Sequence, residues 1–130
     1  MPINPFRNRT SPTADGKKAE QLAEDHLKKK GLLPISRNYR CKAGEIDLIM
    51  VDKDALVFVE VRMRSACGFA SAAESVTRTK QARLIRAASH YLLNHPEAAE
   101  QPCRFDVIAI DKKAHQADIN WIPNAFDTNR

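Results

Sequence analysis

The chain opens, after a polar segment, on a helical pattern of apolar residues. Small or apolar side chains and one histidine recur every three or four positions, at Ala19, Leu22, Ala23, His26 and Leu27. This spacing puts them on one face of an amphipathic helix. Thr13 or Asp15 can cap its N-terminus, and Gly31 is a natural stop after three lysines. A similar pattern predicts a second, longer helix from about Thr77 to Leu93.

Between and after these helices, short apolar runs bounded by turn residues predict β-strands. The runs cover residues 32–40, 45–51, 55–63, 103–111 and 117–126. In the fourth run, Asp106 is expected to pair with Arg104 or to cap the sheet end. A helix between two strands of one sheet is typical of a right-handed crossover, which makes those strands parallel. We therefore expect an α/β fold with an αβββαβ core, in which helices flank a mixed central sheet.

The second predicted strand is apolar on both faces. Ile46, Leu48 and Met50 alternate with Ile49 and Val51, so each set is expected on its own face. Strands of this kind lie at the centre of a sheet that is covered on both sides.

One domain accounts for most of the chain. Its 130 residues suffice for a single hydrophobic core. Residues 1–14 hold three prolines among polar residues, which predicts a flexible N-terminal arm. We assign residues 15–126 to a single domain and residues 127–130 to a C-terminal tail.

Composition limits the classes of partner and the cellular compartment that we expect. The net charge is +5 and the pI about 9.3, a weak preference for acidic partners such as nucleic acid. Cys41, Cys67 and Cys103 form no CxxC pair, so we expect reduced thiols rather than a zinc site or disulfides. No apolar run reaches the length of a membrane span, and no signal-peptide core is recognised. We therefore expect a cytoplasmic protein without membrane association.

In the hairpin GEIDLIMVDKDALVFVEVRMR, three acids outside the turn interrupt the apolar strands: Glu45, Asp47 and Glu60. If residues 53–54 form a two-residue turn, paired positions have a constant sum, and Asp47 lies directly opposite Glu60. By the same count Glu45 lies opposite Arg62. Because side chains alternate between faces, all four are expected on one face of the sheet.

Directly opposed carboxylates repel one another, so something must offset their charge. Hard oxygen ligands at this spacing suit Mg²⁺, which accepts one or two carboxylates together with water. A raised pKa in one acid, or an ion pair with Arg62, would also offset the repulsion. The pattern favours the metal site and leaves a structural ion-pair network open.

Several segments together resemble the YraN family, a bacterial family of unassigned activity. They are GKKAEQLAEDHLKKKGL, RNYRCKAGEIDLIMVDKDALVFVEVRMR, SVTRTKQARLIRAASHYL, RFDVIAID and the terminal NAF. That family in turn resembles the PD-(D/E)xK nucleases, which have a restriction-endonuclease-like fold, and especially the archaeal Holliday-junction resolvases. The resemblance implies a nuclease-like domain and an Mg²⁺- or Mn²⁺-dependent endonuclease that acts on branched or structured DNA. Since the resolvases are two-fold dimers, it also leaves a homodimer open.

In those nucleases a helix glutamate precedes a strand aspartate and an E-x-K motif. The resemblance assigns these three acids to Glu20, Asp47 and Glu60, which would hold the metal. Arg62 completes the catalytic set, at a position where the nucleases usually have lysine. Arginine can grip phosphate, but it is a poor proton acceptor. The alternative function is therefore a catalytically inactive module that binds DNA or protein.

Basic side chains flank the acidic hairpin and line the start of the second helix. Six are predicted to contact nucleic acid: Arg37, Arg40, Lys42, Arg64, Lys80 and Arg83. Such a cluster can grip a phosphate backbone. Lys80 could also supply an ammonium in place of the missing lysine, although a solvated helix lysine is the simpler interpretation.

Overall fold

The structure is a computed structural model that describes residues 14–65, 76–112 and 117–126. The elements along the chain are α2 (Ala14–Lys29), β1 (Leu33–Cys41), β2 (Gly44–Asp52), β3 (Ala55–Ser65), α3 (Arg78–Asn94), the 3-10 helix η1 (Ala98–Glu100), β4 (Cys103–Lys112) and β5 (Ala117–Ile122). The predicted α/β class and αβββαβ order are confirmed. Most of the predicted N-terminal arm and the predicted tail, 127–130, lie outside the described residues.

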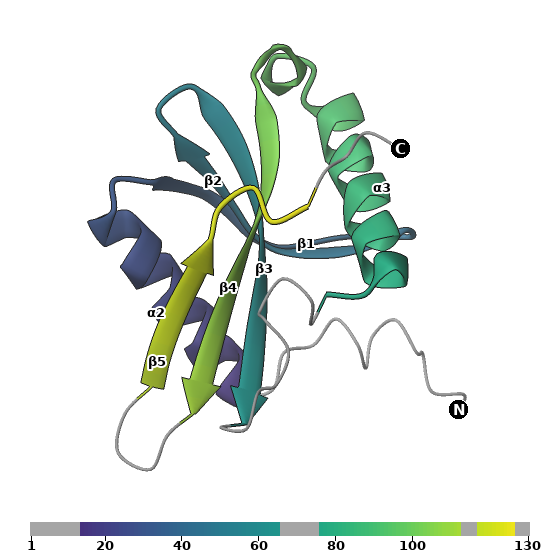
Figure 1. Ribbon diagram of the computed structural model, residues 1–130. Helices are drawn as coiled ribbons and strands as arrows, with labels where there is room; N and C mark the ends of the chain where they lie inside the picture. The colour runs from purple at the N-terminus through teal and green to yellow at the C-terminus, as the bar shows by residue number, and fades with distance from the viewer. Residues whose placement is uncertain (1–13, 66–75, 113–116, 127–130) are drawn as a thin grey trace.

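The five strands form one sheet in the order β1-β2-β3-β4-β5 (Figure 1). Strands β3 and β4 are parallel, as the helix between them predicted, and the other neighbours are antiparallel. Helices α2 and α3 pack on opposite faces, so each face has its own buried cluster. The central strands are thus covered on both sides, which explains their nearly continuous apolar sequence.

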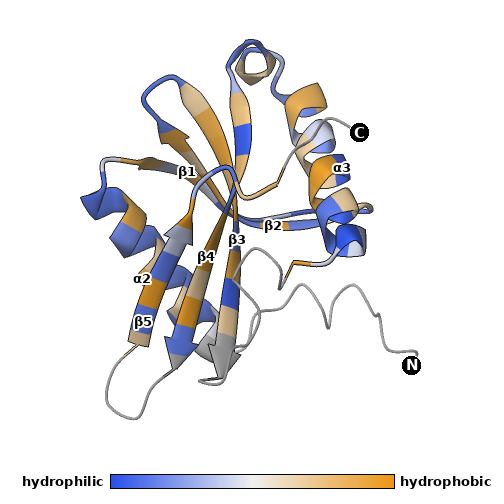
Figure 2. Cartoon of the chain, in the orientation of Figure 1, coloured by the Kyte–Doolittle hydropathy of each residue, from blue (hydrophilic) through white to orange (hydrophobic). Residues whose placement is uncertain are grey.

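The helices bury one face each, and Figure 2 shows apolar and polar segments alternating along both. Helix α2 contributes Ala19, Ala23 and Leu27 to the buried cluster on its face of the sheet. On the other face, α3 contributes Leu84, Ala87, Ala88 and Tyr91. No helix in the described part of the chain is long and apolar enough to cross a membrane.

The ends of the helices follow local rules. After α2, Gly31 has φ +102° and donates to Lys28 O, while Leu32 donates to Leu27 O. These are the two bonds of a Schellman motif, so Gly31 is the predicted stop. At the start of α3, Thr77 is the N-cap, and its side chain accepts a hydrogen bond from Lys80 N.

The predicted register of the β2–β3 hairpin is confirmed. Asp52 pairs with Ala55 around the turn, and the ladder continues to Leu48 opposite Val59. Lys53, in the turn, has φ 58°, which suits a tight hairpin connection. Asp47 and Glu60 come directly after this last pair.

One side-chain assignment from the sequence is wrong. Ile46 packs in the cluster under α3 with Ile49, whereas Leu48 packs under α2. Strict alternation would have put Ile46 and Leu48 on one face. The irregularity coincides with Asn38 on β1, which has φ 55° and lies, by count, opposite Asp47. A left-handed residue breaks the pleat locally, so the facing strand changes its alternation here.

A second buried acid ties β4 to β5. Asp106 has no exposed surface and accepts hydrogen bonds from Arg104 Nε, Trp121 Nε1 and Asn124 N at 2.8–2.9 Å. Arg104 also donates to Asp52 at 3.0 Å. The predicted pairing of Asp106 with Arg104 is confirmed, and every partner is a donor.

Candidate functional site

The two hairpin acids meet where the ladder between β2 and β3 ends. Asp47 Oδ2 accepts a hydrogen bond from Val61 N at 2.8 Å, so the carboxyl group of β2 is anchored to the backbone of β3. Glu60 is only 4% exposed, and the two carboxyl groups contact each other. The fold therefore brings together the pair that the register predicted.

The pKa of Asp47 is raised well above its usual range. Burial is the largest cause, the charge of Glu60 is the second, and the charge of Glu20 adds to both. The hydrogen bond from Val61 N acts in the opposite direction, because it stabilises the carboxylate. Burial and like charge outweigh it, so Asp47 holds a proton more tightly than an ordinary aspartic acid.

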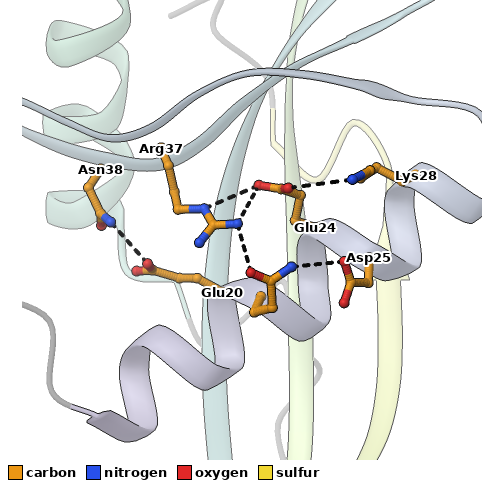
Figure 3. A network of polar contacts seen from close by, with 7 residues as sticks. Glu20, Glu24, Asp25, Lys28, Arg37 and Asn38 are labelled. Carbon is orange, nitrogen blue, oxygen red and sulfur yellow. Dashed lines mark hydrogen bonds and ion pairs between the residues drawn. The ribbon is translucent and has the colours of Figure 1, made fainter.

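Glu20 approaches the same place from α2. It is 7% exposed and accepts a hydrogen bond from Asn38 Nδ2 at 3.1 Å (Figure 3). Burial raises the pKa of Glu20, the Asn38 bond and the charge of Arg37 lower it, and the charge of Glu60 raises it. Glu20 therefore lies within electrostatic reach of Glu60, and the irregular residue on β1 holds it there.

Glu45 joins the cluster at the start of β2. Its partner on β1 is Arg40. Burial raises the pKa of Glu45, the charges of Arg40 and Lys80 lower it, and the charge of Glu60 raises it. The predicted opposition of Glu45 and Arg62 falls beyond the last pair of the ladder. Glu45 is thus a fourth acid in this cluster.

Two cations meet the buried carboxylate of Glu60. Lys80 Nζ lies 3.0 Å from Glu60 Oε2, and Arg62 Nη1 lies 3.9 Å from the same oxygen. Lys80 comes from α3, across the sheet–helix interface, and its side chain is 43% exposed, so a helix lysine that reaches solvent also pairs with a buried acid. The buried Nε of Arg62 has no hydrogen-bond partner among the described residues.

The donor set suits a hard divalent cation bound by few protein ligands. Within residues 14–65, 76–112 and 117–126, no three His, Cys, Asp or Glu side chains are gathered as a metal-binding group. What the fold gathers closely is the pair Asp47 and Glu60, with Glu20 nearby. Mg²⁺ commonly binds one or two carboxylates and keeps several waters. The residues fit that arrangement.

The predicted phosphate contact Arg37 is engaged elsewhere. It donates to Glu24 Oε1 from Nε and Nη2, at 3.2 and 2.8 Å, and to Gln21 Oε1 at 3.1 Å (Figure 3). These bonds fasten β1 to α2 beside Glu20. In the structure Arg37 thus supports the position of a predicted site residue.

Of the other bases predicted to contact nucleic acid, the structure describes the side chains of some and not of others. Arg40 and Lys42, at the β1–β2 turn, and Arg83, on α3, are exposed. A Cβ added to Gly44 would lie 3.5 Å from Arg83 Cβ, so the hairpin and α3 are in contact here. The side chain of Arg64 lies outside the described part of the chain.

Sequence reasoning missed the part that Asn38 plays. Asparagine tolerates positive φ better than most residues, and counting pairs from the β1–β2 turn puts it opposite Asp47. That combination was the available signal. It would have indicated both the break in the pleat and a partner for Glu20.

Comparison with known proteins gives the family. The model of an uncharacterised protein family, UPF0102, matches residues 19–110. This chain belongs to the UPF0102 family. A UPF0102 protein of Saccharophagus degradans is 54% identical over 114 residues, 88% of this chain and 93% of the relative. One from Cupriavidus metallidurans is 50% identical over 124 residues, 95% and 88%. One from Pseudomonas entomophila is 46% identical over 118 residues, 90% and 96%.

The UPF0102 match confirms the family part of the sequence-based resemblance. It covers most of α2, the strands β1 to β3, α3 and most of β4. Every acid of the cluster therefore lies inside the region that the family shares. The family description assigns no activity, so the chemistry has to be argued from the site.

Proposed function

We propose that this UPF0102 protein binds branched or structured DNA and hydrolyses its phosphodiester bonds with Mg²⁺ or Mn²⁺. The observation that supports this most is the contact of Asp47 with the buried Glu60, with Lys80 and Arg62 both at one Glu60 oxygen. Buried acids in contact destabilise a fold unless something offsets their charge. Clusters with perturbed pKa values are typical of functional sites.

Each acid has a role in this proposal. Asp47 and Glu60 hold the cation, and Glu20 reaches it directly or through water. When bound, the cation lowers the pKa of water and stabilises negative charge on a phosphate. At pH values below its raised pKa, Asp47 would give up a proton in order to become a ligand. The terminal nitrogens of Arg62, one of them 3.9 Å from Glu60 Oε2, suit a contact with a phosphate.

The reaction is a displacement at phosphorus. The oxygen of a water molecule bonds to phosphorus, and the bond to one bridging oxygen breaks, with its electron pair leaving on that oxygen. The water molecule loses one proton to the surrounding solvent, and the leaving oxygen takes up one proton from the solvent. The residues of the chain orient the phosphate and the water for this step, which is where much of the rate gain of such enzymes arises.

A second candidate is a DNA-binding module without hydrolysis. The observation that favours it is Arg62, because a guanidinium stays protonated and cannot exchange a proton with the attacking water. The two candidates share the phosphate-binding surface and differ only in turnover.

The test is cleavage of a four-way DNA junction in Mg²⁺, with Glu60→Gln beside the wild type. We expect the variant to lose about 100-fold or more in rate, because a neutral amide weakens both the cation site and the contact with Lys80. Asp52→Asn is the matched control, since Asp52 is an acid of the same hairpin that binds Arg104. Its rate should stay within about threefold of the wild type. Junction binding without cleavage would favour the second candidate. A wild type that neither binds nor cleaves the junction would contradict both candidates.

Cation binding can be measured separately by calorimetry with Mg²⁺. Because the pKa of Asp47 is raised, binding at pH values below that pKa should release protons, so the measured heat there should depend on the ionisation enthalpy of the buffer. The buffer dependence should disappear in Asp47→Asn. Absence of Mg²⁺ binding in the wild type would contradict the proposed cation site.

A further inference from the structure

Neither the family description nor the comparison with E-x-K nucleases assigns a role to Lys80. On the basis of its contacts, and resting on the proposed function, we infer that Lys80 is a catalytic residue of the site. Its ammonium contacts the reacting phosphate and holds the attacking water. Arg62 then binds the phosphate. Together the two cations supply the phosphate and water contacts that a single lysine supplies in an E-x-K site.

The geometry of the contact supports this assignment. Lys80 Nζ is 3.0 Å from Glu60 Oε2, nearer than Arg62 Nη1 at 3.9 Å. The Glu60 side chain is 4% exposed and that of Lys80 is 43% exposed. The ammonium therefore connects a buried carboxylate to the solvent side, where a phosphate would arrive. It has three N–H donors in all, so two remain for other oxygens when one is directed at Glu60.

The location of Lys80 on its helix is a second, independent observation. It lies in the first turn of α3, where its backbone N–H is bound by the Thr77 cap. That turn contains no acid, although acids are favoured there and a cation opposes the helix dipole. A local preference broken in this way is more typical of a functional position than of a structural one. The charge of Glu60 offsets the unfavourable placement.

The two cations also differ in chemistry. The guanidinium of Arg62 is planar, and its two terminal nitrogens suit bidentate phosphate binding. The ammonium of Lys80 is compact and rotates on a flexible stem. One of its free N–H groups can therefore turn toward a water oxygen beside the phosphate.

The test compares Lys80→Met with Lys28→Met, a lysine of α2 that pairs at 4.0 Å with Glu24, an acid outside the cluster. In Mg²⁺, we expect Lys80→Met to lose about 100-fold in the rate of junction cleavage, and Lys28→Met less than about threefold. Without divalent cation, the slope of log affinity against log salt should become less negative by about one in Lys80→Met alone. The second readout does not depend on turnover.

Moving the ammonium sharpens the test. In Arg62→Lys/Lys80→Met, an ammonium stands at the E-x-K position, and we expect at least about tenfold recovery of the rate over Lys80→Met. If the wild type cleaves and Lys80→Met cleaves equally well, the role of Lys80 is wrong while the proposed function stands. If the wild type binds DNA without cleaving, hydrolysis is wrong, and the salt slope decides Lys80: a loss of about one supports its phosphate contact and an unchanged slope overturns it.

Discussion

Two groups of acids lie within this sheet, one on β4 and one where β2 and β3 diverge, and their surroundings are opposite in kind. On β4, Asp106 is surrounded by donors: Arg104, Trp121 and the backbone of Asn124. At the end of the β2–β3 ladder, Asp47 contacts another acid, Glu60. By strand alternation Asp106 lies on the α2 face and Glu60 on the α3 face.

The difference separates an acid that stabilises a fold from an acid that the fold tolerates. The donors around Asp106 come from three parts of the chain, and both of its carboxylate oxygens accept hydrogen bonds. Asp47 has one backbone donor and a like-charged neighbour. A buried acid of the first kind contributes to stability, whereas one of the second kind reduces it until a proton or a cation arrives.

The largest effect should come from Asp106→Ala. Removing the carboxylate leaves Arg104 and Trp121 without their acceptor, and loss of one partner from a buried pair costs about 3–5 kcal/mol. Urea unfolding measures this cost. Asp52→Ala is the control, because Asp52 is partly exposed and bound to Arg104 alone in the described contacts, and it should cost about 1 kcal/mol or less. Equal costs in the two variants would contradict the comparison.

A smaller effect of opposite sign is expected from Asp47→Asn. The folded-state pKa of Asp47 is raised, so the unfolded chain loses this proton first as pH rises. Stability of the wild type therefore falls above about pH 4, where an ordinary aspartate ionises, until the folded pKa is passed. Asparagine mimics the protonated form and avoids this loss. The variant should match the wild type near pH 4 and exceed it at neutral pH.

Thermal unfolding across that pH range measures the effect. A gain of about 1 kcal/mol would raise the Tm of a domain of this size by roughly 4 °C. Asp52→Asn is the control, since it removes an attractive contact with Arg104 and should gain nothing at any pH. If Asp47→Asn is less stable than the wild type at neutral pH, Asp47 belongs with Asp106 as a structural acid.

The fold and the acid pair were predictable because both follow from local rules. Periodicity gave the element order, and a two-residue turn fixed the hairpin register from Asp52 to Leu48. The opposition of Asp47 and Glu60 follows from that count. The break in the pleat at Ile46 was not predictable in the same way, because it depends on the backbone of Asn38 on another strand.

The cations were harder to predict than the acids. Lys80 and Glu60 are separated by a connection that includes residues 66–75, so no register relates them. Arg37 has the charge of a phosphate ligand, but its partners Glu24 and Gln21 come from a helix whose docking angle is set by tertiary packing. Side chains from helices reach the site through packing, which a one-dimensional pattern does not contain.

The smallest effect should come from Arg37→Gln, which tests whether this arginine supports the fold or binds phosphate. Its contacts with Glu24 are close but lie at the surface, so their loss should cost about 0.5–1 kcal/mol, and less in high salt. Lys28→Gln, whose pairing with the same Glu24 is longer at 4.0 Å, should cost less still. Urea unfolding and DNA affinity are measured on both variants. Reduced stability with unchanged affinity would assign Arg37 to the scaffold that holds Glu20, whereas reduced affinity with unchanged stability would restore the sequence-based assignment to nucleic acid.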